Sequence, residues 1–240
     1  MRTRATTFLA ATFLCLAPVQ SRAALNVYIQ DFESLVQADP AALANDGWFV
    51  FGNVFSPDHS SYYYGYGPFP APNPGGGFSA IVTGEGGGGQ GAQQLNIYSD
   101  YNNGDHANGN LIEANVYHEQ TIGPGDVGKT VVFMFDAKRG NLAPPTTAAA
   151  FIKTLDPMSG YATTHFVTAD MTSIPQTWGA YSISLAIDAG LVGQLLQFGF
   201  MNTATSYAGS GVFYDNIHFL PDSATPTRSA SWGRIKSLYR

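Results

Sequence analysis

Short strand-like segments, separated by turn-forming residues, run through the whole sequence and limit its possible folds more than any other feature. In residues 181–187 every second side chain is large and apolar, which is the two-residue period of a strand with one buried face. The 27 glycines and 14 prolines weaken helix interiors and favour turns between such segments. The pattern predicts an all-β chain and argues against an all-helical fold.

Ten segments carry this alternation or a run of β-branched and aromatic residues. They are residues 27–33, 47–51, 78–82, 94–98, 111–122, 130–135, 150–155, 181–187, 195–201 and 212–220. About ten short strands without a long helix are typical of an antiparallel β-sandwich of the jelly-roll kind. We therefore expect one sandwich domain over residues 24–221.

The first 23 residues have the composition of a secretory signal peptide. Arg2 and Arg4 precede an apolar run over residues 8–19, and small residues follow at positions 21 and 23. The run is shorter than the ~20 residues of a membrane-spanning helix. We expect an exported chain without a transmembrane segment, secreted or held at the cell surface. The single cysteine, Cys15, lies in this segment, so the mature chain is expected to lack disulfides.

Charge is distributed unevenly along the chain. Residues 24–221 contain four basic residues against 16 acidic ones, a net charge of about −12. Nucleic-acid binding requires a basic face, so we expect no nucleic-acid partner. Residues 222–240 carry three arginines and one lysine, and they read as a flexible spacer with a basic tail. That tail docks on the acidic domain, contacts an anionic surface or acts as a sorting signal.

Five short motifs follow one another over nearly the whole mature chain. They are Asp31-Phe32-Glu33, Asp46-Gly47-Trp48, residues 128–138, residues 178–184 and residues 211–217. In their order and spacing they resemble secreted carbohydrate-binding modules of families 4, 9 and 22, which share a galactose-binding-like jelly roll. The resemblance implies a structural calcium held by the acid of the opening motif and the aspartate of the closing one. These map to Glu33 and Asp215, with Asp31 beside them.

Asp215 also has a physical argument of its own. Strand alternation places it on the same face as Phe213 and Ile217, so a carboxylate points into an apolar layer. A buried carboxylate is costly unless it is paired, hydrogen-bonded or metal-bound, and calcium prefers such oxygen ligands. The alternative is capping by backbone amides. If Phe32 faces the core, Glu33 faces away, so the calcium site requires that this strand ends and turns there.

Two segments are candidates for ligand binding. Residues 61–69 are predicted to form a tyrosine-rich loop. Aromatic rings stack on sugar faces, so this loop offers a binding platform. The alternative is that its rings pack against the sandwich. The run of residues 100–110 alternates oxygen-bearing side chains, but Leu111 stands where an EF-hand has its closing glutamate. A turn-rich hairpin explains it as well as a sugar contact or a second calcium does. The candidate ligand-binding residues are Tyr62, Tyr63, Tyr64, Tyr66, Tyr101, Asn102 and His106.

The sequence contains no familiar catalytic motif. It lacks the Glu-x-Asp-x-x-Glu string of laminarinase-type glycosidases and the Gly-x-Ser-x-Gly elbow, and Arg139 is the single arginine between residues 24 and 221. Glu113 and Glu119 share a strand face, where they bind a cation or are solvated. We expect a non-catalytic protein that binds polysaccharide at the cell surface or in the matrix. The alternatives are a structural protein that mediates protein contacts and a divergent polysaccharide-acting enzyme; no oligomeric state follows from the sequence.

Overall fold

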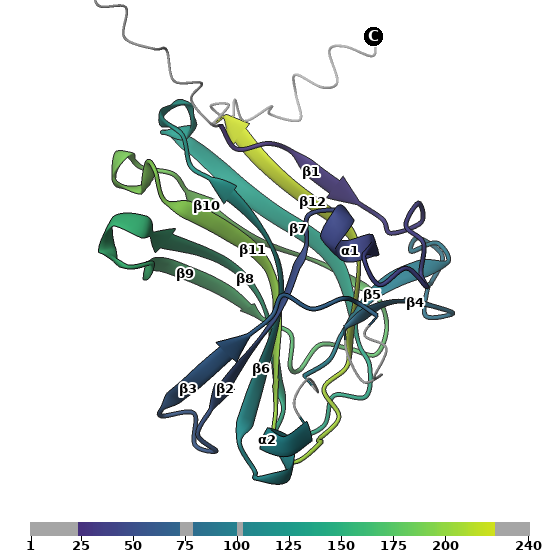
Figure 1. Ribbon diagram of the computed structural model, residues 1–240. Helices are drawn as coiled ribbons and strands as arrows, with labels where there is room; N and C mark the ends of the chain where they lie inside the picture. The colour runs from purple at the N-terminus through teal and green to yellow at the C-terminus, as the bar shows by residue number, and fades with distance from the viewer. Residues whose placement is uncertain (1–23, 73–78, 100–102, 224–240) are drawn as a thin grey trace, which may run out of the picture.

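Two antiparallel sheets of six strands each face one another in this computed structural model, which describes residues 24–72, 79–99 and 103–223 (Figure 1). Sheet A has the order β10 (Gly179–Ala186), β7 (Lys129–Arg139), β12 (Val212–Ser223), β5 (Gln93–Ile97) and β4 (Ala80–Thr83), with β1 (Tyr28–Gln30) also paired to β12. Sheet B has the order β3 (Tyr62–Tyr66), β2 (Phe49–Phe55), β6 (Leu111–Thr121), β11 (Leu195–Ala204), β8 (Thr147–Asp156) and β9 (Ala162–Asp170). The predicted all-β sandwich is confirmed.

Aromatic rings from the inner faces of both sheets form the centre of the core. Phe198 of β11 stacks on Phe219 of β12 with ring centroids 4.0 Å apart, and Phe200 stacks on Tyr214 at 3.6 Å. All four side chains are fully buried. Strand side chains alternate between the two faces of a sheet. The odd-numbered residues of β11, such as Gln197, therefore project from the outer face of sheet B.

The short helices and turns lie between the strands. They are α1 (Ala42–Asn45), α2 (Asn103–Ala107), η1 (Pro124–Asp126), η2 (Pro157–Ser159) and η3 (Ala189–Leu191). No helix within the described ranges is long and apolar enough to cross a membrane. The predicted signal peptide, residues 1–23, and residues 224–240 of the predicted tail lie outside the described residues.

The corrections to the prediction include two missed strands and two shifted boundaries. The segment predicted as a tyrosine-rich loop is strand β3, and β9 also lacks a counterpart among the ten predicted strands. Both are edge strands of sheet B, with few buried side chains and hence no strong apolar alternation. The first predicted strand is shortened to β1, because Phe32 has a left-handed backbone with φ of 61°. Strand β12 extends to Ser223, two residues into the predicted spacer.

A cluster of polar and aromatic side chains lies where β1 and β6 meet the turn after α1. Asp46 accepts hydrogen bonds from the hydroxyl of Tyr28 and from Gln30 Nε2, the latter at 2.7 Å. Trp48 Nε1 donates to the Tyr28 hydroxyl at 2.8 Å, and the His118 ring lies 4.0 Å from the Tyr28 ring. Burial lowers the pKa of His118 to about 4, although nearby Asp46 opposes the shift. His118 is therefore neutral in the folded protein near neutral pH.

This buried histidine predicts a loss of stability in acid. Below pH 6.5 the unfolded chain takes up a proton at His118, whereas the folded chain does so only near pH 4. The contribution of His118 to the free energy of unfolding should therefore fall by about 3 kcal/mol between pH 6.5 and 4, with no further loss below that range. Urea unfolding at several pH values measures this, and His118→Phe should remove this contribution. If His218→Phe, a change at a half-buried histidine of β12, removes as much, the assignment to His118 is wrong.

Candidate functional site

The outer face of sheet B carries a hollow of about 200 Å³ formed by strands β6, β8, β9 and β11. Its lining residues are Glu113, Asn115, Phe151, Lys153, Thr163, Phe166 and Met201. The ring of Phe166 is 52% exposed, and it lies 6.1 Å from the ring of Phe151, which is buried. An aromatic wall beside carboxylate, amide and ammonium groups suits a ligand that has both apolar and hydroxyl surfaces.

The two glutamates of β6 are held in place by side-chain amides. Glu113 Oε1 accepts from Asn53 Nδ2 at 3.0 Å and from Asn115 Nδ2 at 2.9 Å. Glu119 Oε2 accepts from Gln197 Nε2 at 2.7 Å. Within the described part of the chain, Gln197 Oε1 is buried without a hydrogen-bond partner. Such an orphan acceptor is costly, but Gln197 is buried and does not line the hollow.

Lys153 lines this hollow. Among the described residues it is the single Lys or Arg of sheet B, because the other three all lie on β7. Its Nζ lies 5.4 Å from the ring centroid of Phe151. Burial lowers the pKa of Lys153, while the charges of Glu113 and Glu119 oppose that shift. Among the residues that the structure describes, Nζ has neither a hydrogen bond nor an ion pair. The ammonium is thus partly desolvated and able to donate to a ligand.

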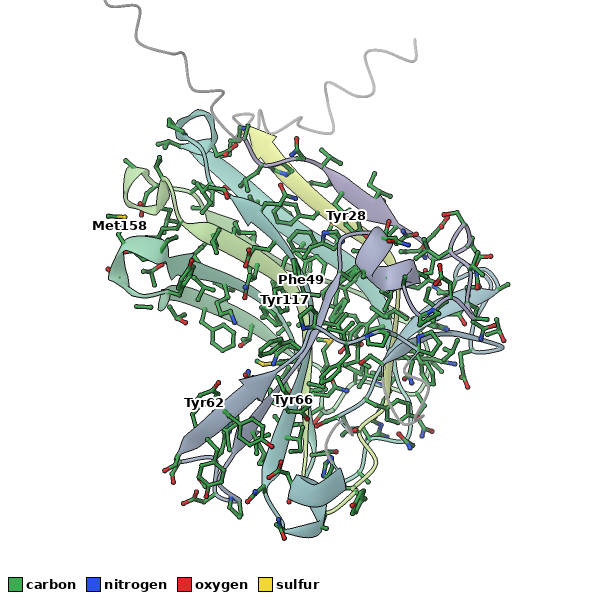
Figure 2. All side chains as sticks on the ribbon, in the orientation of Figure 1. Tyr28, Phe49, Tyr62, Tyr66, Tyr117 and Met158 are labelled. Carbon is green, nitrogen blue, oxygen red and sulfur yellow. The ribbon has the colours of Figure 1, made fainter. Side chains whose placement is uncertain are left out.

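A flat row of residues crosses sheet B next to the hollow. Phe49 stacks on Tyr117 with centroids 5.5 Å apart, and Figure 2 labels both rings. Tyr117 is the strand partner of Gly199, and Gly199 is the strand partner of Phe151. Gly199 has no side chain and is itself buried, so the floor between Tyr117 and the buried ring of Phe151 is backbone. Burial, and to a smaller extent Glu119, raises the pKa of Tyr117.

Strand β3 brings the predicted tyrosines to one edge of this face. Tyr62, Tyr63 and Tyr64 are exposed and Tyr66 is half-buried. Tyr62 lies opposite Phe55 and contacts its ring edge-on at 5.6 Å, on the outer side of the sheet. Tyr64 and Tyr66 point to the other side, where the Tyr64 hydroxyl donates to Asp105. Of the four, Tyr62 therefore shares a face with the hollow.

The second predicted segment contributes nothing to this face. Tyr101 and Asn102 lie outside the described residues. His106, in α2, is 1% exposed, and its Nε2 lies 2.9 Å from the carbonyl oxygen of Ser99. The assignment of His106 as a ligand contact is wrong, because the short helix turns this ring into the protein rather than toward solvent. The polar sequence gave no sign of that burial.

The predicted calcium residues gather at the other sheet, where β1 ends beside β12. Glu33 Oε1 accepts from the backbone amides of Ala92 and Gln93 at 2.7 and 2.6 Å. Asp31 Oδ1 accepts from the amide of Glu33 at 3.1 Å. Asp215 is fully buried, but the register of β12 shifts between Asp215 and His218, which breaks the alternation that placed Asp215 on the face of Ile217. The left-handed backbone at Phe32 provides the turn that brings Glu33 toward this place.

Asp215 lacks compensation for its charge. Its Oδ1 accepts from the amide of Asn216 at 2.6 Å, but Oδ2 is buried without a hydrogen-bond partner in the described ranges. Burial raises its pKa to about 7, and the charges of Glu33, Asp136 and Asp31 add to that shift. Backbone capping, the alternative to calcium, is therefore only half fulfilled. No three His, Cys, Asp or Glu side chains among the described residues already converge as a metal-binding group.

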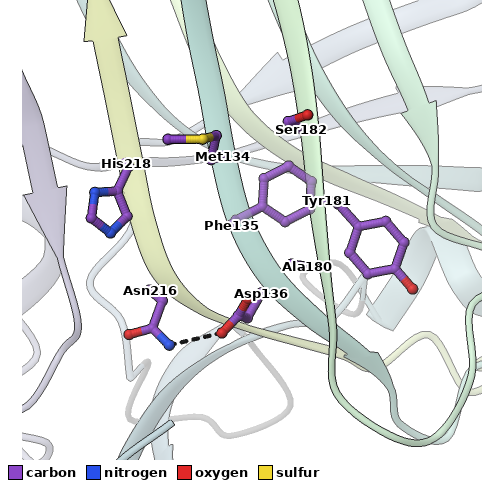
Figure 3. A pocket seen from close by; sticks show the side chains of 8 residues that line it. All are labelled: Met134, Phe135, Asp136, Ala180, Tyr181, Ser182, Asn216 and His218. Carbon is purple, nitrogen blue, oxygen red and sulfur yellow. Dashed lines mark hydrogen bonds between the residues drawn. The ribbon is translucent and has the colours of Figure 1, made fainter. Parts of the chain in front are cut away.

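A larger hollow of about 340 Å³ lies along β7, β10 and β12 (Figure 3). It is lined by Met134, Phe135, Asp136, Ala180, Tyr181, Ser182, Asn216 and His218. The amide of Asn216 donates to Asp136 Oδ2 at 2.8 Å and to the carbonyl oxygen of Gly89 at 2.9 Å. Gln90 Nε2 donates to the same Asp136 oxygen at 2.8 Å. The carboxylate of Asp136 is already satisfied by these amides, so this hollow makes a weaker case for a ligand than the one on sheet B.

No protein-family profile matches the sequence, and no curated protein matches it. Among solved structures, the chain is similar to the enzymatically active domain of tailspike protein 4 of bacteriophage CBA120, at 15% identity and a TM-score of 0.42 over 72% of this chain and 19% of that one. It is also similar to the carbohydrate-binding module TmCBM61, solved with β-1,4-galactotriose, at 14% and 0.37 over 60% and 82%. A third is the α-L-arabinofuranosidase MgGH51, at 10% and 0.48 over 83% and 27%. At this level of similarity these structures assign neither a family nor a function.

Proposed function

We propose that the protein binds carbohydrate without cleaving it, through the outer face of sheet B. The observation that carries this proposal is the hollow where the exposed ring of Phe166 meets an amide-fixed carboxylate and a partly desolvated ammonium. Sugar rings offer C–H faces that stack on aromatic rings and hydroxyls that both donate and accept hydrogen bonds. The expected export of the chain would place this face in contact with polysaccharide of the cell surface or matrix.

The spacing of the glutamates supports binding rather than hydrolysis. Glycosidases place their two catalytic carboxyl groups roughly 5–9.5 Å apart. Glu113 and Glu119 are six residues apart on one strand, which separates their backbones by roughly 20 Å at the usual rise per residue. They therefore do not form a pair of this kind.

The proposal predicts a specific loss of binding on aromatic substitution. Phe166→Ala should weaken glycan binding about 10-fold or more, since aromatic rings covered by a ligand dominate the energetics of an interface. Tyr62→Ala should have a smaller effect from the edge of the face. Tyr64→Ala is the matched control, because its ring points to the other side of β3. A glycan array selects the ligand, and isothermal titration calorimetry then measures the affinity.

A reducing-sugar assay on the same glycans separates the alternatives. Binding without product release supports the proposal. Product release would identify a polysaccharide-acting enzyme. Absence of both, with the variants folded, would favour a structural protein that contacts other proteins.

We also propose a structural calcium held by Glu33 and Asp215, with Asp31 beside them. The orphan Asp215 Oδ2 and the surrounding negative charges support it, because calcium prefers oxygen ligands and would offset the repulsion among these carboxylates. When bound, the ion would fix the end of β1 against β12 rather than take part in chemistry.

A further inference from the structure

The hollow on sheet B is small and combines charges of both signs. Its volume of about 200 Å³ is below the roughly 300–1,000 Å³ of pockets that enclose drug-sized ligands. It therefore has room for one compact unit, while the flat row of Phe49, Tyr117 and Gly199 continues beside it. A single sugar unit of a longer glycan fits this combination.

The charge balance of this face is negative. Two carboxylates, Glu113 and Glu119, act on one ammonium, that of Lys153. The amides of Asn53 and Asn115 both donate to Glu113 Oε1, which fixes the carboxylate, and in the part of the chain described here Glu113 Oε2 accepts no hydrogen bond. An acidic unit entering the hollow would bring a third negative charge close to this fixed one.

The available hydrogen-bonding groups match hydroxyls. The free oxygen of Glu113 is an acceptor and the ammonium of Lys153 is a donor, and both residues line the hollow. A hydroxyl donates and accepts at once, so neighbouring hydroxyls of an uncharged sugar satisfy both kinds of group. A carboxylate or sulfate accepts only, and it would leave the Glu113 oxygen unsatisfied.

On these grounds, and resting on the proposed function, we propose that the hollow selects an uncharged sugar unit and rejects acidic ones, with Lys153 and Glu113 as the specificity-determining pair. Glu113 accepts from a sugar hydroxyl and repels a uronate. Lys153 donates to a second hydroxyl. The negative charges of the two glutamates offset the positive charge of Lys153, so the ammonium does not attract an anion. Selectivity thus comes from a repulsive element as well as an attractive one.

Matched glycans that differ only in charge test this proposal. The folded full chain is titrated by calorimetry with neutral oligosaccharides, with their uronate counterparts and with their amino-sugar counterparts, starting from whichever backbone the array selects. We expect the uronate form to bind at least ~10-fold more weakly than the neutral form, because a charged group is desolvated beside a like charge. Tighter binding of the uronate or of the amino sugar than of the neutral parent would overturn the proposal while leaving glycan binding intact.

Two variants assign the selectivity to residues. Glu113→Gln keeps an oxygen for Asn53 and Asn115 and removes the charge, so it should narrow the preference for the neutral glycan to about 3-fold or less. Lys153→Met keeps the length of the side chain and should weaken binding of the neutral glycan about 10-fold. An unchanged preference in Glu113→Gln would remove Glu113 from the role. Absence of binding to every glycan by the folded wild-type chain would end both this proposal and the proposed function, whereas a reversed preference would end this one alone.

Discussion

We expect the calcium-free protein to lose stability as the pH rises from about 4 to above 7. The folded chain keeps a proton on Asp215 up to about pH 7, whereas the unfolded chain releases it near 3.8. Asp215 therefore binds a proton on folding in this interval, and its contribution to the free energy of unfolding should fall by about 4 kcal/mol across it. Bound calcium would stabilise the ionised carboxylate, so calcium should remove most of this loss.

Differential scanning calorimetry with excess chelator or excess calcium measures the effect. The rise in melting temperature on adding calcium should be larger at pH 8 than at pH 5. Asp215→Asn should abolish both the calcium response and the loss of stability with pH, while Asp170→Asn, an exposed control on β9, should preserve them. The contribution of His118 to stability changes in the opposite direction between pH 4 and 6.5. The measurement therefore compares Asp215→Asn with the wild type at each pH. Identical melting temperatures with and without calcium at pH 8 would rule the site out.

The second large effect is expected at Gly199, in the middle of sheet B. A Cβ at this position would lie 2.2 Å from the carbonyl oxygen of Val116 and 2.6 Å from the Cα of Tyr117. Both are backbone atoms of the neighbouring strand, so they move only if β6 and β11 separate. Gly199→Ala should lower the free energy of unfolding by about 3 kcal/mol, as overpacking does in rigid interiors. It should also weaken glycan binding, because it disturbs the floor between Tyr117 and Phe151.

Urea unfolding of Gly199→Ala measures the first effect, and calorimetry with the selected glycan measures the second. Gly125→Ala is the matched control, since a Cβ there has no atom within 4 Å and its backbone is not left-handed. This variant should change the free energy of unfolding by less than about 1 kcal/mol. Equal stability of the two variants would contradict the close approach of β6 and β11 at Gly199.

Local alternation made much of the fold predictable. The segments that became β6, β10 and β12 mostly bury one face, so their side chains repeat with a period of two, whereas β11 is buried on both faces. The burial of Asp215 is confirmed, although a register shift in β12 interrupts the alternation there. Strand β3 was missed because its exposed tyrosines and Gly65 resemble a loop when the neighbouring strands are unknown.

The candidate site was harder to predict, because strand pairing assembles it from distant segments. The sequence places Glu113 and Glu119 on one face of a strand, but gives no sign that Lys153 approaches them across β11. Phe166 belongs to β9, an edge strand with weak alternation. Parity along each strand gives the outward residues, whereas the order β6-β11-β8-β9, which brings them together, depends on the tertiary fold.

The position of the last two strands bears on when the chain is able to fold. Strands β11 and β12 come last in the described sequence, yet each lies inside its sheet with partners on both sides, and their rings stack on one another across the sandwich. A growing polypeptide that ends before them has two incomplete half-sheets, and Phe133 and Phe135 lack the rings of Phe198 and Phe200 that pack against them in the folded chain. The sandwich core therefore closes only when nearly all of the described chain has been made.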